Sequence, residues 1–213
     1  MNGRKGPGDG SGHQDSGPHP SEWARQRFGK DAARLTVAVP ERLTRAHLRA
    51  QAGYKASGLT RPGAAYGHTL AETVREELAL EAEELGGDVR LLRGRSYAVI
   101  NEQVLFPYKY GSHPTPVEDA TMKEPSLVRR RLFAAYGPEE PEGLFPVDEY
   151  STEEYEHLHE AFEELGRVQN LVSVFFTCDP ENGVHAIHWG EARLEPDGTF
   201  SWAYREELPT VGT

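Results

Sequence analysis

Several features that identify common protein classes are missing from this chain of 213 residues. It has a single cysteine, Cys178, so no disulfide can form within one chain, and a reducing, cytoplasmic setting is the simplest expectation. No apolar run approaches the roughly 18–20 residues that a membrane span requires, so no membrane partner is expected. The polar, glycine-rich N-terminus also lacks the apolar segment of a secretory signal.

Short catalytic signatures are missing too. The sequence contains no Gly-x-Ser-x-Gly elbow, no Walker phosphate loop, no His-Glu-x-x-His and no Cys-x-x-Cys. These absences remove the reaction classes that are easiest to recognise, but not enzymes whose functional residues are scattered along the chain. We expect a protein without a resident cofactor.

The formal charge of −11 is unevenly distributed. Residues 1–61 carry eleven Lys and Arg against five Asp and Glu, a net charge of +6, whereas residues 62–213 carry −17. A basic leading segment on an acidic body indicates either an anionic partner for the basic part or docking of one part on the other. The acidic body itself would repel the phosphates of nucleic acids.

Residues 95–111 predict a central β-hairpin. Two β-rich runs, Tyr97–Ile100 and Val104–Tyr110, flank the pair Asn101-Glu102, and asparagine tolerates the positive φ of a tight turn. Side-chain alternation gives one face of the second run to Val104, Phe106, Tyr108 and Tyr110. We therefore expect a packed layer over that face and place the hairpin at the centre of the sheet.

A three-stranded antiparallel meander is predicted at the C-terminus. Residues 171–177 are a nearly continuous apolar run of strand length, and turn signals at 182–183 and 196–198 bound two further strands, 185–194 and 199–205. In the last strand Phe200, Trp202 and Tyr204 are expected to share one face.

Two capping boxes predict helices packed on one face of this sheet. One begins at Thr69 and reaches residue 85, with a glutamate-rich surface that is either solvated or a docking surface for the basic segment; the other begins at Ser151 and ends at Gly166. The remaining elements are expected to be a strand at 35–39, a helix from Pro40 to Ala52, a loop at 54–67, a strand at 89–92 and a helix at 127–136. The predicted fold class is α+β with a mainly antiparallel sheet.

Two parts are expected along the chain. Residues 1–34 are predicted to form a flexible, basic arm, because its Gly- and Pro-rich start cannot offset its ordering entropy by burial. Trp23 and Phe28 are candidates to anchor this arm to the body. Residues 35–213 are predicted to form a single α+β domain.

One candidate site is a set of charged residues around the central hairpin: Glu102, Glu118, Asp119 and Lys123. Glu102, Asp119 and Lys123 are the three nominated for catalysis. Metal-dependent nucleases hold Mg²⁺ with two or three carboxylates and use a lysine to orient water or stabilise the leaving phosphate. Under this hypothesis the three residues are catalytic and Mg²⁺ is the cofactor. A charged surface loop explains the same residues.

Histidine and cysteine provide weaker candidates. Glu156 and His159 are spaced to share a metal across one helical turn, although no matching motif occurs elsewhere. Cys178 could act with His185 or His188 as a nucleophile and base, whereas a buried structural thiol is the simpler interpretation.

The basic segment 43–61 resembles the helix-turn-helix of phage-repressor-like regulators. The resemblance is carried by the Leu43-Thr44 opening, Leu48, the Ala52-Gly53 turn, Ser57 and the run Leu59-Thr60-Arg61. It implies that a second helix enters the major groove of DNA. The nominated nucleic-acid or anion contacts are Arg45, Arg49, Lys55 and Arg61.

Two further groups could contribute to binding. The consecutive residues Arg129, Arg130 and Arg131 fan over about 200° of a helix, so one or two of them are expected to pair with the acidic helices. Tyr97, Tyr108 and Trp189 are expected in a packed aromatic layer, or alternatively along a cleft that binds a small molecule.

The favoured interpretation is a non-enzymatic, regulatory binding protein of the cytoplasm. Its basic segment would contact an anionic partner, with nucleic acid an option through residues 1–61, and its acidic body would dock another protein. One alternative is a metal-dependent hydrolase or nuclease that uses Glu102, Asp119 and Lys123. The other is a small-molecule binder with an aromatic-lined cleft.

Overall fold

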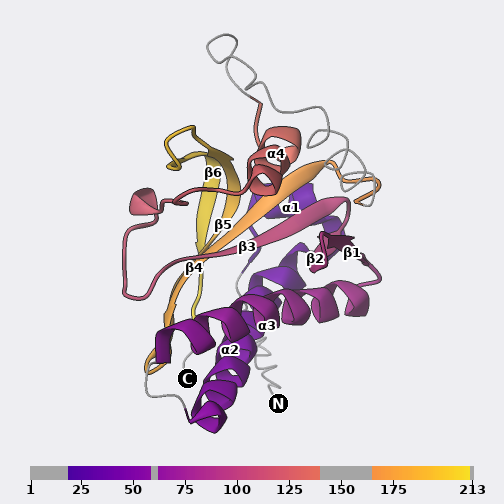
Figure 1. The fold of residues 1–213 in the computed structure, drawn as a ribbon. Coiled ribbons are helices and arrows are strands. Elements are labelled where there is room, and N and C mark those ends of the chain that lie inside the picture. Colours follow the sequence, from indigo (N-terminus) through magenta and orange to yellow (C-terminus); the bar gives the residue numbers. More distant parts are fainter. Residues whose placement is uncertain (1–18, 59–61, 140–164, 212–213) are drawn as a thin grey trace, which may run out of the picture.

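The computed structural model describes residues 19–58, 62–139 and 165–211 (Figure 1). The first part of the predicted arm lies outside these residues, and so does most of the helix predicted from Ser151, together with Glu156 and His159. The charged residues 45, 49, 55, 102, 119 and 123 are all described, whereas Arg61 is not.

The predicted α+β class is confirmed by a mixed sheet whose strands follow the order of the sequence. The strands are β1 (Asp88–Leu92), β2 (Arg95–Ile100), β3 (Gln103–Gly111), β4 (Asn170–Asp179), β5 (Gly183–Leu194) and β6 (Phe200–Leu208). Neighbouring strands are antiparallel except β3 and β4, which run parallel. A parallel pair needs a long crossover, and this one carries the short helix η2 (Val117–Asp119) and α4 (Leu127–Tyr136).

The hairpin and the meander are present where turn chemistry predicted them. Asn101 and Glu102 link β2 to β3 with φ values of 50° and 62°, the left-handed pair that a two-residue hairpin turn favours. The strands β4, β5 and β6 form the antiparallel meander.

The N-terminal helices differ from the prediction. The strand expected at 35–39 is wrong, because these residues belong to α2 (Ala32–Ser57), which continues through Pro40. Leu35, Val39 and Leu43 recur every four residues and are all buried, which is the spacing of a helix face. Leu48, farther along the same helix, is 51% exposed.

The helix-turn-helix is not formed, because α2 passes through the expected turn at Ala52-Gly53 without a break. It ends at Gly58, whose φ of 64° suits a glycine. The helix α3 (Pro62–Glu84) begins within the predicted loop, and Thr69 lies inside it, where its hydroxyl donates to the carbonyl of Ala65 at 2.9 Å. Proline is favoured in the first helical turn, so Pro62 starts a helix here.

Helices cover both faces of the sheet, rather than the single face predicted. Figure 1 shows α2 and α3 on the side away from α4. The first face packs against α2, including Val39, and against α3, including Leu70 and Val74. On the second face Phe133 of α4 meets Phe106 with ring centroids 5.1 Å apart.

Packed structure also begins before the boundary predicted at residue 34. The helix α1 (Glu22–Phe28) and the turn η1 (Gly29–Asp31) precede α2, and Trp23 and Phe28 are buried in the first core. Phe28 stacks on Trp189 with ring centroids 5.2 Å apart. Burial of two large aromatic side chains offsets the entropy of ordering this segment.

The expected common face of Phe200, Trp202 and Tyr204 is interrupted. Glu191 pairs with Tyr204 while Ala192 pairs with Trp202, so β6 carries one extra residue between them. Such a bulge reverses the alternation of side chains. Trp202 therefore packs on the α4 side of the sheet, and Tyr204 packs on the other side.

Candidate functional site

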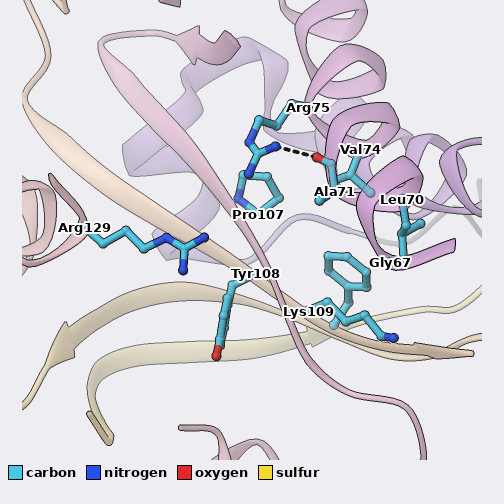
Figure 2. Close-up of a pocket in the computed structure, with 10 residues that line it drawn as sticks. Gly67, Leu70, Ala71, Val74, Arg75, Pro107, Tyr108, Lys109 and Arg129 are labelled. Atoms are coloured by element: carbon cyan, nitrogen blue, oxygen red, sulfur yellow. Dashed lines mark hydrogen bonds between the residues drawn. The ribbon is translucent and has the colours of Figure 1, made fainter. Parts of the chain in front are cut away.

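A cavity of about 260 Å³ lies between α3, α4 and the edge of β3 (Figure 2). Its lining comes from α3 (Gly67, Leu70, Ala71, Val74 and Arg75), β3 (Pro107, Tyr108 and Lys109), α4 (Arg129) and β4 (Phe176). The lining thus combines apolar side chains with three cationic residues, Arg75, Lys109 and Arg129.

The cavity exists because β2 separates from β3 soon after their shared turn. The two strands pair only at Val99–Val104 and Ile100–Gln103, whereas β4 stays paired with β3 from Gln103 to Gly111. The rest of β3 therefore has a free edge on the β2 side, as far as the described residues show. Pro107 lies on this stretch, and a proline without an N–H is tolerated at an edge.

Arg75 reaches the cavity from α3. Its side chain is only 9% exposed, and one terminal nitrogen donates to the carbonyl of Ala71 at 2.8 Å and to Glu72 at 2.9 Å. Its Nε is buried and has no hydrogen-bond partner among the residues that the structure describes. A buried donor without an acceptor costs free energy, so this nitrogen has unused capacity to bind an anion.

Lys109 and Arg129 complete the cationic group. Lys109 Nζ contacts the Ser112 hydroxyl at 3.1 Å and lies 5.7 Å from the centre of the Tyr66 ring. Neither Lys109 nor Arg129 has a carboxylate partner among the described residues; one or two of Arg129, Arg130 and Arg131 were expected to pair with the acidic helices. Figure 2 shows that Arg75 and Arg129 approach β3 from α3 and from α4.

Burial is the largest influence on the pKa values of Arg129 and Lys109, and for Lys109 the nearby Cys178 and Asp179 oppose it. Burial lowers the pKa of Arg129, and the nearby Arg95 and Arg75 lower it further. Burial likewise lowers the pKa of Lys109. An anion about 4 Å from one such charge would gain about 4 kcal/mol at an effective dielectric constant of 20.

Only one of the three nominated aromatic residues lines the cavity. Tyr108 does, and its hydroxyl donates to the carbonyl of Thr121 at 2.6 Å. Tyr97 is buried against Phe106 on the α4 side of the sheet, and Trp189 is fully buried on the opposite side. The structure thus does not bring these three together.

The nominated basic residues of α2 lie away from the cavity. Arg49 forms ion pairs with Glu76 and Glu77 of α3, Arg45 lies 3.9 Å from Glu41, and Lys55 donates to Gln51 at 3.0 Å. Two residues that were not nominated extend the same network: Arg34 binds Glu81 and Glu84, and the buried Arg42 binds Glu77, Glu81 and Glu84. Much of the basic segment is therefore docked on the protein's own acidic helix.

The proposed nuclease residues lie in separate elements. Glu102 is in the β2–β3 turn, where Gln169 donates to it, whereas Asp119 ends η2 beyond the other end of β3 and Lys123 follows it. Within the described ranges, no group of three His, Cys, Asp or Glu side chains could hold a metal ion.

Cys178 is part of a buried polar cluster. Its Sγ lies 2.9 Å from the hydroxyl of Tyr66 and 3.7 Å from Nδ1 of His47, and that hydroxyl also contacts His47 at 2.8 Å. Burial raises the pKa of the thiol, which disfavours the nucleophilic thiolate. His185 bonds instead to the carboxylate of Asp179 at 2.7 Å. The cluster has the properties of a structural core.

Sequence reasoning missed Arg75, Lys109 and Arg129 as members of one site. The available signals were weak: one arginine among the glutamates of α3, a proline within a strand pattern, and a lysine within an aromatic run. None of these signals shows that the three side chains line one cavity.

No protein family, curated protein or solved structure matches this chain at a significant level. The fold class is α+β, and the site that its described part presents is a small cationic cavity at a strand edge. Over the same residues, no helix is both long enough and apolar enough to cross a membrane.

Proposed function

We propose that this chain is a non-enzymatic binding protein that recognises an anionic group in the cavity beside β3. The approach of Arg75 and Arg129 to that cavity, with Lys109 also in its lining, carries the proposal. Arg75 is paired with Glu72, whereas Arg129 has no carboxylate partner among the described residues, and a half-buried cation without such a partner is unfavourable for stability. Such an arrangement is typical of a site that a ligand completes.

The size of the cavity limits the ligand. Its volume of about 260 Å³ is below the roughly 300–1,000 Å³ of sites for drug-sized molecules. A carboxylate or phosphate with a small body fits better than a whole nucleotide. Arginine guanidinium groups bind both kinds of oxyanion with paired hydrogen bonds.

The side chains that line the cavity favour binding over catalysis. Tyr108 already donates its hydroxyl to a backbone carbonyl, and Lys109, the other lining residue that could act as a base or nucleophile, is held by the Ser112 hydroxyl and lies near the Tyr66 ring. This supports binding rather than catalysis. We place the protein in the cytoplasm, in a regulatory role with a protein partner; the single buried thiol supports a reducing setting.

A titration by ¹H–¹⁵N NMR tests the anion site. Sodium phosphate and sodium acetate are each added to the full chain at low ionic strength, and amide shifts are followed near Gly67, Lys109 and Arg129. We expect saturable shifts concentrated at these positions, weakened by added NaCl because salt screens the attraction.

The matched variants are Arg129→Gln, which removes a lining cation, and Arg130→Gln, which removes the adjacent charge on α4 outside the lining. At least a tenfold loss of affinity is expected for the first and little change for the second. Shifts scattered over the surface, or equal responses of both variants, would refute the anion site.

A further inference from the structure

The free edge of β3 offers more than a place for a small anion. From Leu105 to Gly111 this strand has β4 on one side and, within the described ranges, no strand on the other. At roughly 3.3 Å per residue, the stretch is about 20 Å long, enough for several residues of a second strand. Leu105 and Phe106 are buried, but the residues from Pro107 onward are partly exposed.

The backbone of this edge is only partly suited to pairing. Ile100 and Gln103 flank a two-residue hairpin turn, so the backbone N–H and C=O of Gln103 face β2. Every second residue of β3 after Gln103 directs its backbone N–H and C=O to that same side. Leu105, Pro107 and Lys109 then direct their carbonyls to the free side, but Pro107 supplies no N–H. A partner strand would make an incomplete ladder here, and it would need side-chain anchors for affinity.

Arg75 and Arg129 provide these side-chain anchors, one on each face of the sheet. Arg75 approaches from α3 on one face of the sheet, and Arg129 approaches from α4 on the other (Figure 2). Successive side chains of an extended peptide point to opposite faces. Two adjacent acidic residues would therefore meet Arg75 and Arg129 in turn.

Resting on the proposed function, we infer that the ligand is an acidic polypeptide segment that adds to the free edge of β3 as a strand. Main-chain bonds to the edge hold the segment, and adjacent acidic side chains fill the cationic cavity, which is a known mode of peptide recognition. Nucleic acid is disfavoured as the ligand, because the net charge of the chain repels a polyanion.

The experiment is a selection of random displayed decapeptides on the immobilised full chain, followed by synthesis of the best binder. Enriched peptides are expected to contain two adjacent Asp or Glu flanked by β-branched residues. Replacing both acids by their amides, or changing the protein by Arg129→Gln, should each weaken binding at least tenfold; Arg130→Gln should not. N-methylation of single peptide amides should weaken binding at every second position only, because alternate amides face the edge.

The outcomes separate this inference from the proposed function. If phosphate and acetate titrate the cavity but the selection yields no acidic peptide, or N-methylation shows no two-residue period, the strand addition is refuted and the anion site stands. If neither small anions nor acidic peptides bind, both proposals fall. Enrichment of basic peptides would also refute the inference, since these would dock on the acidic surface.

Discussion

Trp23 stacks on Tyr204 with ring centroids 4.7 Å apart, which joins the first helix to the last strand. The indole N–H of Trp23 also donates to Glu191 of β5 at 2.9 Å. The N-terminal helix is therefore part of the core rather than an appendage. This contact has a direct consequence for stability.

Trp23→Ala should lower the free energy of unfolding by about 3–5 kcal/mol, because it removes a large buried side chain and leaves its partners uncovered. Urea denaturation followed by circular dichroism measures the change. Val37→Ala is a suitable control, since Val37 is 39% exposed on α2 and should change stability far less. If the two variants are equally stable, α1 contributes nothing to the core.

Arg42→Ala should lower the free energy of unfolding by about 3 kcal/mol, because it removes the buried cation that binds Glu77 and Glu81 and leaves them only the half-exposed Arg49 and Arg34. Arg42 and Glu81 are 7% and 3% exposed, and they are 2.9 Å apart. Arg45→Ala, on the exposed side of the same helix, should change stability by less than about 1 kcal/mol. Similar losses in the two variants would show that burial of the ion pair is unimportant.

Cys178 should resist thiol reagents in the folded protein. Its side chain is fully buried and burial raises its pKa, so little thiolate is present or accessible near pH 7. Labelling with iodoacetamide, read by mass spectrometry, should become fast only in denaturant. Rapid labelling of the native chain would instead indicate a reactive cysteine.

Asp179 should contribute to the loss of stability in acid. Hydrogen bonds from Asn182, Glu181 and His185 hold its pKa well below the ordinary value, in spite of the opposing effect of burial. A depressed pKa in the folded state adds stability above the unfolded pKa of about 3.9, and this stability is lost as pH falls towards the folded value.

Asp179→Asn should therefore lower stability at pH 7 and flatten the decline of unfolding free energy below pH 4. Denaturation curves collected across this range provide the measurement. Asp197→Asn changes a carboxylate in an exposed turn and serves for comparison. If the free energy of unfolding of Asp179→Asn declines below pH 4 as steeply as that of the parent chain, Asp179 does not contribute to the loss of stability in acid.

Local chemistry explains which parts of the fold could be predicted. The Asn101-Glu102 turn and the turns that flank β5 are encoded within a few residues, so the hairpin and the meander were found with nearly correct limits. The long α2 was missed because Pro40 and Gly53 suggest helix ends, whereas the buried leucine and valine stripe overrides them. The bulge in β6, which turns Tyr204 to the other face, has no comparable local signal.

The site was less accessible from sequence for a physical reason. Arg75, Lys109 and Arg129 belong to three elements. They line one cavity only because β2 and β3 stop pairing after two residue pairs, which opens the space between β3 and the helices. Of the nominated residues, Tyr108 alone lines the cavity. The basic residues of α2 stand out in the sequence by their charge, but Arg49 forms ion pairs with Glu76 and Glu77 of α3 and lies away from the cavity.

The free energy of unfolding of Arg129→Met, measured in sodium phosphate and in sodium chloride of equal ionic strength, tests the cationic cavity most directly. The parent chain should gain stability in phosphate, since a ligand that binds only the folded state stabilises it. Arg129→Met should lose that gain and should be more stable than the parent in chloride, because a half-buried cation with no carboxylate partner among the described residues has been removed. An equal phosphate effect in both proteins, or a variant less stable than the parent in chloride, would contradict the account.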